Sequence, residues 1–222
     1  MLHDDKFAQK AKELLVWKTT KSSHVTPDAS ATHYYVTEEQ LGSPLVELYE
    51  QKNIDVLIAK MPIDAAIMSK LEHSSSIRFK RIDSNLQEGL VDSTSGDSSA
   101  LVDFVKKSLA LDGVEVEAKN LTTQETAGII VIGEEERRLR DYLARISKEK
   151  MASAPVKKTF VVNTNSPLVQ AIQKMKDSEL ASMMVRELYD LAALGQKELS
   201  NEEMRAYITR NTKLLEKVAC AI

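Results

Sequence analysis

The chain has 222 residues, of which 43% are hydrophobic and 28% charged, as in an ordinary globular protein. Its net charge of −3 argues against a nucleic-acid-binding surface, which needs a basic excess. The apolar runs are far shorter than the roughly 20 residues that cross a bilayer, and the amino terminus lacks the pattern of a signal peptide. The single cysteine, Cys220, predicts no internal disulfide. We therefore expect a cytoplasmic protein with one large or two modest domains.

The first ninety residues have the pattern of a small α/β domain. Apolar Leu14–Trp17 is a candidate buried strand, and residues 33–37 are rich in β-branched and aromatic side chains, which favours a strand. Residues 54–59 are largely apolar, as in a strand buried on both faces. Residues 77–82 alternate, as in an edge strand. Helices are predicted from Ser43-Pro44 to Lys52 and from Pro62 onward. Strand, helix, strand, helix, strand over 33–82 predicts a small α/β/α sandwich with parallel strands.

A Ser-, Asp- and Gly-rich stretch at 84–100 is the predicted domain boundary. It separates a first domain, 1–90, from a second domain, 97–222. Beyond it we predict a helix at 101–111, a helix at 134–150 and a helix from Ser166-Pro167. The predicted strands of this half are 114–117, 128–132 and 159–162. The second half is therefore α+β, with a three-stranded sheet.

Residues 177–218 predict two amphipathic helices joined by a tight break. Gly195 tolerates the left-handed conformation that ends helices, and Ser200 with Glu203 forms a capping box for the second helix. The apolar stripes can pack on the chain's own domain or pair with a second copy as a four-helix bundle. Their breadth favours a dimer. The predicted interface residues are Leu180, Met183, Met184, Leu188, Leu191, Met204, Tyr207, Ile208, Leu214, Leu215 and Val218.

No catalytic, cofactor-binding or metal-binding residues are predicted. The four histidines, His3, His24, His33 and His73, lack metal-ligand spacing. Cys220 has no neighbouring histidine in the sequence, and no glycine-rich turn joins a strand to a helix.

The helix at 134–150 carries an apolar stripe whose role the pattern leaves open. Its residues are Leu139, Tyr142, Leu143 and Ile146. This face either covers the sheet or projects into solvent as a binding patch.

Several segments, taken in order, carry a family resemblance. In the first half they are His33-Tyr34-Tyr35-Val36-Thr37, Ser43-Pro44-Leu45, Lys52-Asn53-Ile54-Asp55-Val56-Leu57 and Pro62-Ile63-Asp64. In the second half they are Val161-Val162-Asn163-Thr164-Asn165-Ser166-Pro167-Leu168-Val169 and Glu187-Leu188-Tyr189-Asp190-Leu191-Ala192. Together they resemble the ninety-kilodalton heat-shock chaperone family, especially its bacterial members. The family has glycine at the position of Asn53 and asparagine-proline at Asn163-Thr164.

The resemblance implies the carboxy-terminal part of such a chaperone, comprising the end of the middle domain and the dimerisation domain. It implies a homodimer, unfolded client proteins bound through the 139–146 face, and a role in protein folding and the stress response. ATP and Mg²⁺ would belong to an ATPase domain that has no counterpart here, so the resemblance implies no enzymatic activity for this chain. The chain ends Ala219-Cys220-Ala221-Ile222 without the acidic tail of eukaryotic members, so tetratricopeptide co-chaperones are not expected. Neither nucleic acid nor membrane is an expected partner.

The chain also departs from the family pattern. Ala65 stands where an acid usually follows the isoleucine-aspartate pair, and Arg137, Arg138 and Arg140 make the 134–150 helix more basic than in relatives.

Two other functions remain open. One is a dimerising adaptor without clients. The other is a small-ligand site at the carboxyl ends of the strands in 33–82.

Overall fold

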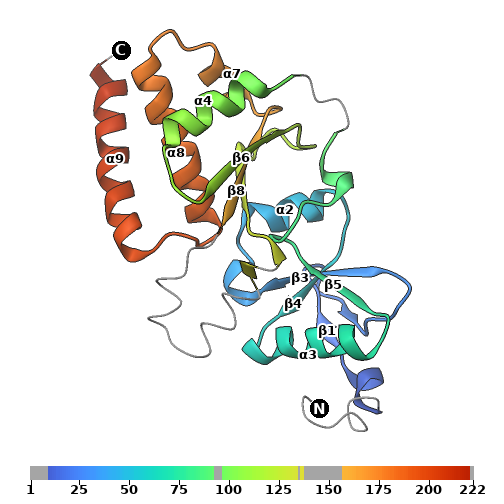
Figure 1. Ribbon diagram of the computed structural model, residues 1–222. Helices are drawn as coiled ribbons and strands as arrows, with labels where there is room; N and C mark the ends of the chain where they lie inside the picture. The colour runs from blue at the N-terminus through green and yellow to red at the C-terminus, as the bar shows by residue number, and fades with distance from the viewer. Residues whose placement is uncertain (1–9, 93–96, 135, 138–156, 221–222) are drawn as a thin grey trace. The chain divides into compact units, whose positions relative to one another are not determined.

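The computed structural model describes residues 10–92, 97–134, 136–137 and 157–220. The chain has mixed α and β content and divides into two compact units, Met1–Asn85 and Leu86–Ile222 (Figure 1). Within the described residues, no helix is long and apolar enough to span a membrane.

The first unit is built on a three-stranded parallel sheet. Its strands are β3 (Thr32–Thr37), β4 (Val56–Ala59) and β5 (Arg78–Arg81), in the order β4-β3-β5. Helix α2 (Pro44–Gln51) follows β3, and helix α3 (Pro62–Ser74) follows β4. Tyr35 and Phe79 pack with α3 residues in one core. Tyr34 lies on the other face of β3, and its ring centroid is 5.2 Å from that of Tyr49 in α2. The helices therefore cover opposite faces of the sheet, and the predicted parallel α/β arrangement is confirmed.

Two predictions in the first unit need correction. Residues Leu14–Trp17 do not form a strand, because Lys12–Leu14 is a 3-10 turn, η1, and Leu14 and Val16 are 81% and 53% exposed. Strand β1 is only Trp17–Lys18, paired with β2 (His24–Val25). The strand predicted at 54–59 begins only at Val56. Its burial is confirmed although β4 lies at the edge of the sheet, where the Thr19–Leu57 bridge covers it.

The second unit has a mixed three-stranded sheet. Its strands are β6 (Val114–Lys119), β7 (Gly128–Val131) and β8 (Lys158–Asn163), in the order β6-β8-β7. Strand β8, the last in sequence, lies in the middle, parallel to β6 and antiparallel to β7. The three strands agree with those predicted at 114–117, 128–132 and 159–162. Short 3-10 turns η2 (Glu38–Gln40) and η3 (Glu88–Leu90) complete the two units.

Helices cover one face of this sheet. They are α4 (Ser99–Leu109), α7 (Pro167–Gln173) and α8 (Ser178–Gly195). Their apolar residues share one core with Val116, Ile130 and Phe160, which are neighbours in register across the sheet. Gly128 allows Phe160 to lie close to β7, since a Cβ at Gly128 would be 2.6 Å from the phenyl ring.

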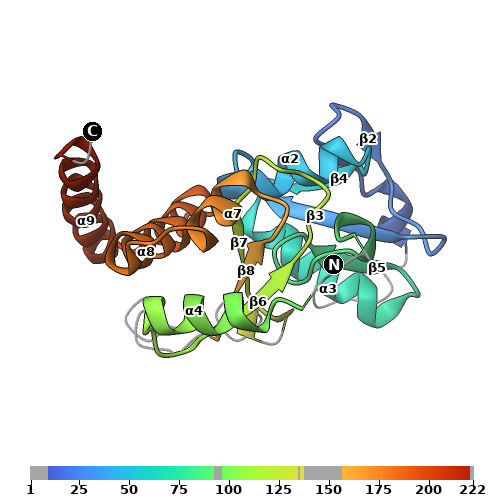
Figure 2. The ribbon, with the colours of Figure 1, turned by 90° about the horizontal axis from the view of Figure 1, so that it is seen from above.

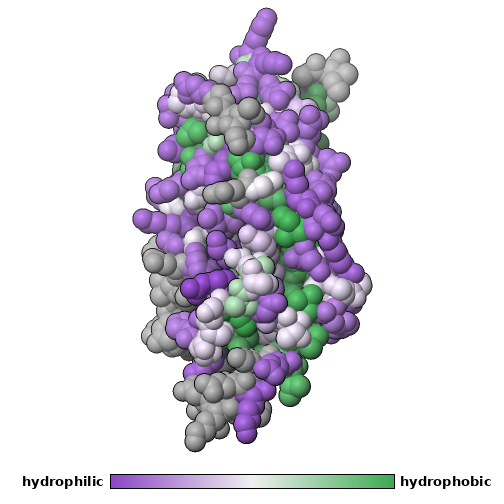
Figure 3. All heavy atoms as spheres, turned by 90° about the vertical axis from the view of Figure 1, so that its right-hand side faces the viewer, coloured by the Kyte–Doolittle hydropathy of each residue, from purple (hydrophilic) through white to green (hydrophobic). Residues whose placement is uncertain are grey.

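Helix α9 (Asn201–Cys220) lies beyond α8, on the side away from the strands of its unit (Figure 2). Leu214 is the one residue of α9 that is buried. Figure 3 shows another face of the molecule, which is mostly hydrophilic, with hydrophobic side chains in smaller groups between the polar ones.

The helix ends were predicted at nearly the right residues, but the capping interactions predicted for them were not all found. Helices α2 and α7 begin after Ser43 and Ser166 with proline in the first turn, as predicted, but neither serine side chain makes the capping hydrogen bond. Gly195 ends α8 without the left-handed conformation that was predicted for it. That conformation falls instead on Lys197, with φ at 55°.

Candidate functional site

The candidate site is the hairpin of α8 and α9, whose ends are set by local hydrogen bonds. Asp177 caps α8, its Oδ1 accepting from the backbone N–H groups of Glu179 and Leu180 at 3.0 Å each. These bonds, that of Leu180 first, lower the pKa of Asp177. The predicted capping box of α9 is confirmed, because Ser200 N–H donates to Glu203 Oε2 at 2.7 Å and Glu203 N–H donates to Ser200 Oγ at 3.2 Å.

Side chains from the end of α8 fix the hairpin to the sheet. Gln196 is buried, and its amide exchanges two 2.7 Å hydrogen bonds with the backbone of Ile130, so it acts as a further partner on the edge of β7. The ring of Tyr189 meets Phe160 edge-on at 5.4 Å. Burial raises the pKa of Tyr189 to about 12. The base of α8 is thus held by both polar and apolar contacts.

A buried carboxylate joins α8 to α9. The side chain of Asp190 is 1% exposed and accepts from Arg210 Nε at 3.0 Å and Nη2 at 2.7 Å. Arg186, one helical turn before Asp190, donates to the same carboxylate at 3.3 Å. Two guanidinium groups therefore neutralise this carboxylate and hold α9 against α8.

Two further polar contacts continue this seam. Asn211 Nδ2 donates to Glu187 Oε1 at 2.7 Å, and Lys217 Nζ lies 2.9 Å from Glu179 Oε2. Burial, and then the negative charge of Glu187, raise the pKa of Tyr207. Sequence reasoning missed Glu187 and Asn211, although each is the one polar residue in an apolar row spaced four and three residues apart.

The structure places the predicted interface residues in three environments. Leu188 and Leu214 are 4% and 6% exposed in the protomer. Leu188 belongs to the core of its own domain, so a charge at Leu188 would test that core and not a contact between chains. The half-buried residues are Leu180, Met183, Met184, Met204 and Tyr207. The exposed residues are Leu191, Ile208, Leu215 and Val218.

The exposed residues are large for a solvent face. Ile208 and Leu215 are 57% and 62% exposed, and Leu194 on α8 adds to the same surface. We call the set Leu180, Met184, Leu191, Leu194, Met204, Ile208, Leu215 and Val218 the apolar hairpin face. Such a surface is typical of an interface.

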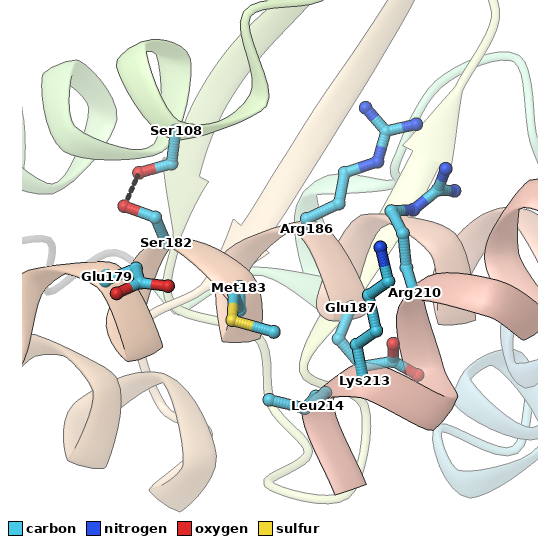
Figure 4. Close-up of a pocket in the computed structure, with 9 residues that line it drawn as sticks. All are labelled: Ser108, Glu179, Ser182, Met183, Arg186, Glu187, Arg210, Lys213 and Leu214. Carbon is cyan, nitrogen blue, oxygen red and sulfur yellow. Dashed lines mark hydrogen bonds between the residues drawn. The ribbon is translucent and has the colours of Figure 1, made fainter. Parts of the chain in front are cut away.

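A hollow of about 300 Å³ lies beside the hairpin seam, between α4 and the two helices (Figure 4). Met183 and Leu214 provide apolar surface there, and Arg186, Arg210 and Lys213 provide positive charge. Ser108 and Ser182 bridge α4 and α8 with a hydrogen bond of 3.2 Å. Both arginines are already bonded to Asp190, so within the described residues Lys213 is the lining cation without a hydrogen bond or ion pair.

The predicted client residues Leu139, Tyr142, Leu143 and Ile146 lie outside the described residues. Of the residues just before them, Glu134 and Glu136–Arg137 are described and are helical. Arg137 is 3% exposed, so it does not add to a solvent-facing basic surface as its position in the sequence suggested.

The alternative site in the first unit does have converging polar groups. After β3 and β5, Gln40 Nε2 donates to Asp83 Oδ2 at 2.8 Å, and Arg81 Nη2 donates to Gln40 Oε1 at 2.7 Å. Gln40 and Asp83 are buried, and the three side chains bond to one another. This cluster locks the strand ends together.

The described residues include histidines, carboxylates and one cysteine. Among them, no three His, Cys, Asp or Glu side chains are grouped to hold a metal ion. Cys220 is exposed near the end of α9.

Three curated relatives show what the chain is similar to. It is 28% identical over 171 residues to the chaperone protein HtpG of Helicobacter acinonychis, and the match covers 74% of this chain and 27% of the relative. It is 27% identical over 192 residues to HtpG of Buchnera aphidicola from Schizaphis graminum, covering 82% of this chain and 31% of the relative. It is 29% identical over 172 residues to HtpG of Helicobacter pylori, covering 74% and 27%. The chain is similar to HtpG chaperones over about three quarters or more of its length.

This relationship confirms the resemblance to the ninety-kilodalton heat-shock family. The chain spans only 27–31% of the length of these HtpG proteins, so the match is to a part of them. No family model matches the chain. At Asn163, where the family motif has asparagine, the buried amide holds the loop before β7, accepting from Leu121 N–H at 3.0 Å and donating to Thr123 O at 2.7 Å.

Proposed function

We propose that this chain is the dimerising part of a cytoplasmic chaperone of the HtpG kind. The relationship to HtpG supports the chaperone role. The observation that carries the dimer is the apolar hairpin face, on which Ile208 and Leu215 are more than half exposed. In this proposal α8 and α9 pair with the same helices of a second copy as a four-helix bundle.

The packing of the hairpin supports a second copy as the missing partner. The opposite side of α8 is already filled, because Val185, Leu188 and Ala192 lie in the core of the unit. Helix α9 has only Leu214 buried in the protomer. Fully burying one exposed Leu or Ile side chain contributes roughly 1.5–3 kcal/mol, so covering this face from two protomers would stabilise a dimer strongly.

Dimerisation gives such a chain a mechanical role in the whole chaperone. Two tethered protomers meet at a high effective concentration, so closure of an ATP-driven clamp becomes intramolecular. In this proposal ATP and Mg²⁺ bind in a part of the chaperone that lies outside this chain, and this chain contributes the permanent contact.

We assign client binding to Leu139, Tyr142, Leu143 and Ile146, as the family resemblance implies. In the complete chaperone, Leu139→Ser with Leu143→Ser should weaken suppression of client aggregation and leave the dimer mass unchanged. Unchanged suppression would favour a dimerising adaptor without clients.

Light scattering on a sizing column over a dilution series tests the dimer. We expect a mass near twice 24.8 kDa. Ile208→Asp and Leu215→Asp should each yield monomer, because they place unpaired charges in the apolar hairpin face. Thr209→Asp is the matched control, since Thr209 is exposed on α9 outside that face and bonds only within its helix. Monomer in the unmodified chain, or dimer in both Asp variants at Ile208 and Leu215, would overturn the proposal.

A further inference from the structure

The apolar hairpin face has one polar pair at its centre. On α8 the row is Leu180, Met184, Glu187, Leu191 and Leu194. On α9 the row is Met204, Ile208, Asn211, Leu215 and Val218. Both rows have steps of four, three, four and three residues, the spacing of a helix seam that packs on another helix. The polar residue is the third of five in each row, and the 2.7 Å bond from Asn211 to Glu187 joins the two rows.

Each row is symmetric about its polar residue to within one residue, because its inner members lie three residues before and four residues after that residue. If α9 packs antiparallel on the α9 of a second copy and the two helices cross at Asn211, Ile208 of one copy lies within one residue of Leu215 of the other along the helix axis. The same crossing places Met204 opposite Val218. An isologous two-fold interface requires this self-matching, because the same patch must serve both partners.

The amide of Asn211 suits the two-fold position. One N–H donates to Glu187, which is 9% exposed and thereby fixes the amide. Within the described residues, the other N–H and the amide oxygen make no hydrogen bond. One donor and one acceptor on the same group complement those of a second, identical group across a two-fold axis.

We propose that Asn211, oriented by Glu187, sets the register of the homodimer by pairing with the Asn211 of a second copy. This inference rests on the proposed function and specifies how the two copies align in the dimer. A slipped register would bury the amide against Leu215 or Ile208 with its polar atoms unpaired, which is costly. A single asparagine in an apolar seam is known to fix register and oligomeric state at a cost in stability. Asn211 is thus a specificity residue, and Glu187 is a positioning residue.

Disulfide trapping in the full chain tests the register, with Cys220→Ser removing the exposed native thiol. At a rise of about 1.5 Å per residue, a crossing at Asn211 separates the two copies of residue 208 by about 9 Å along the axis, and the two copies of residue 215 by about 12 Å. It leaves residue 208 only about 1.5 Å from residue 215 of the other copy. Disulfides rarely form beyond about 7 Å between Cα atoms.

The double variant Ile208→Cys, Leu215→Cys should therefore form covalent dimer roughly tenfold faster than either single variant, a factor equivalent to about 1.4 kcal/mol. Adding Asn211→Leu should retain association but lose this preference, with masses above the dimer appearing. Glu187→Gln keeps an acceptor for Asn211 and should preserve the preference, whereas Glu187→Leu should reduce it.

The outcomes separate the two proposals. A monomeric unmodified chain overturns dimerisation and the register together. A dimer in which the single-cysteine variants crosslink as fast as the double variant overturns the register alone. A preference that survives Asn211→Leu unchanged overturns the role of Asn211.

Discussion

Replacing Gln196 by alanine should destabilise the second unit more than its position at a helix end suggests. Its side chain satisfies both the N–H and the C=O of Ile130, each at 2.7 Å, and Ile130 is fully buried. Each buried backbone group that loses its partner costs about 1–3 kcal/mol. Two such groups, less whatever water regains, predict a loss of about 2–4 kcal/mol in the free energy of unfolding.

The assay is urea unfolding followed by circular dichroism, together with amide hydrogen exchange at Ile130. Gln196→Ala should lower the unfolding midpoint and deprotect the Ile130 amide. Lys197→Ala is the matched control, because the neighbouring Lys197 is exposed. A midpoint shift equal to that of the control, with Ile130 still protected, would refute the view that Gln196 completes the edge of β7.

Three other changes follow from local geometry. Lys197→Gly should raise the free energy of unfolding by roughly 0.5–1 kcal/mol in the same urea assay, because φ of Lys197 is 55° and glycine adopts this conformation without strain. A lower free energy of unfolding would contradict this. Gly128→Ala should cost about 1–3 kcal/mol, since the new methyl group would lie 2.6 Å from Phe160, whereas Gly89→Ala, with nothing within 4 Å, is the neutral control. The raised pKa of Tyr189, about 12 against about 10 when unfolded, means that the neutral ring stabilises the fold below about pH 10 and that this contribution is lost as pH rises towards 12. Tyr189→Phe should therefore show less alkaline destabilisation between about pH 10 and 12 than the unmodified chain, and an identical pH profile would contradict the assignment.

The sequence predicted the elements well where hydrophobic periodicity and caps agreed. The strand at 33–37, the helix after Ser43-Pro44 and the Ser200–Glu203 capping box all appear in the structure. It failed at Leu14–Trp17, where only Trp17 is buried, its ring packing edge-on against Phe79 with 6.1 Å between the ring centroids, and Leu15 packs only partly against the same core. A short apolar run shows preference for burial but not whether the fold supplies a partner.

The candidate site was predicted in outline but not in its polar centre. The apolar stripes of α8 and α9 follow from spacing alone, and most of their residues reach the protomer surface. Leu188 shows what spacing alone does not predict. One apolar stripe contains both residues that face the core and residues that face outward, and only the position of the sheet distinguishes them. Asp190 could not be predicted, since its partner Arg210 lies twenty residues away and is brought close only by the hairpin turn.

Helix α9 links association to folding. Its contacts within the protomer are Leu214, the Asp190–Arg210 pair and a few polar bonds, whereas Ile208 and Leu215 remain exposed. Most helical stability in proteins comes from packing an apolar face, so the second copy should stabilise α9 more than α8 does.

A partner that binds only the folded helix raises apparent stability by mass action. The melting of α9 should therefore shift upward with protein concentration, while the first unit, which has its own core, melts independently of concentration. Amide exchange measured separately in α9 and β3 distinguishes the two, and equal concentration dependence in both would show that the partner acts on the whole chain and not through α9.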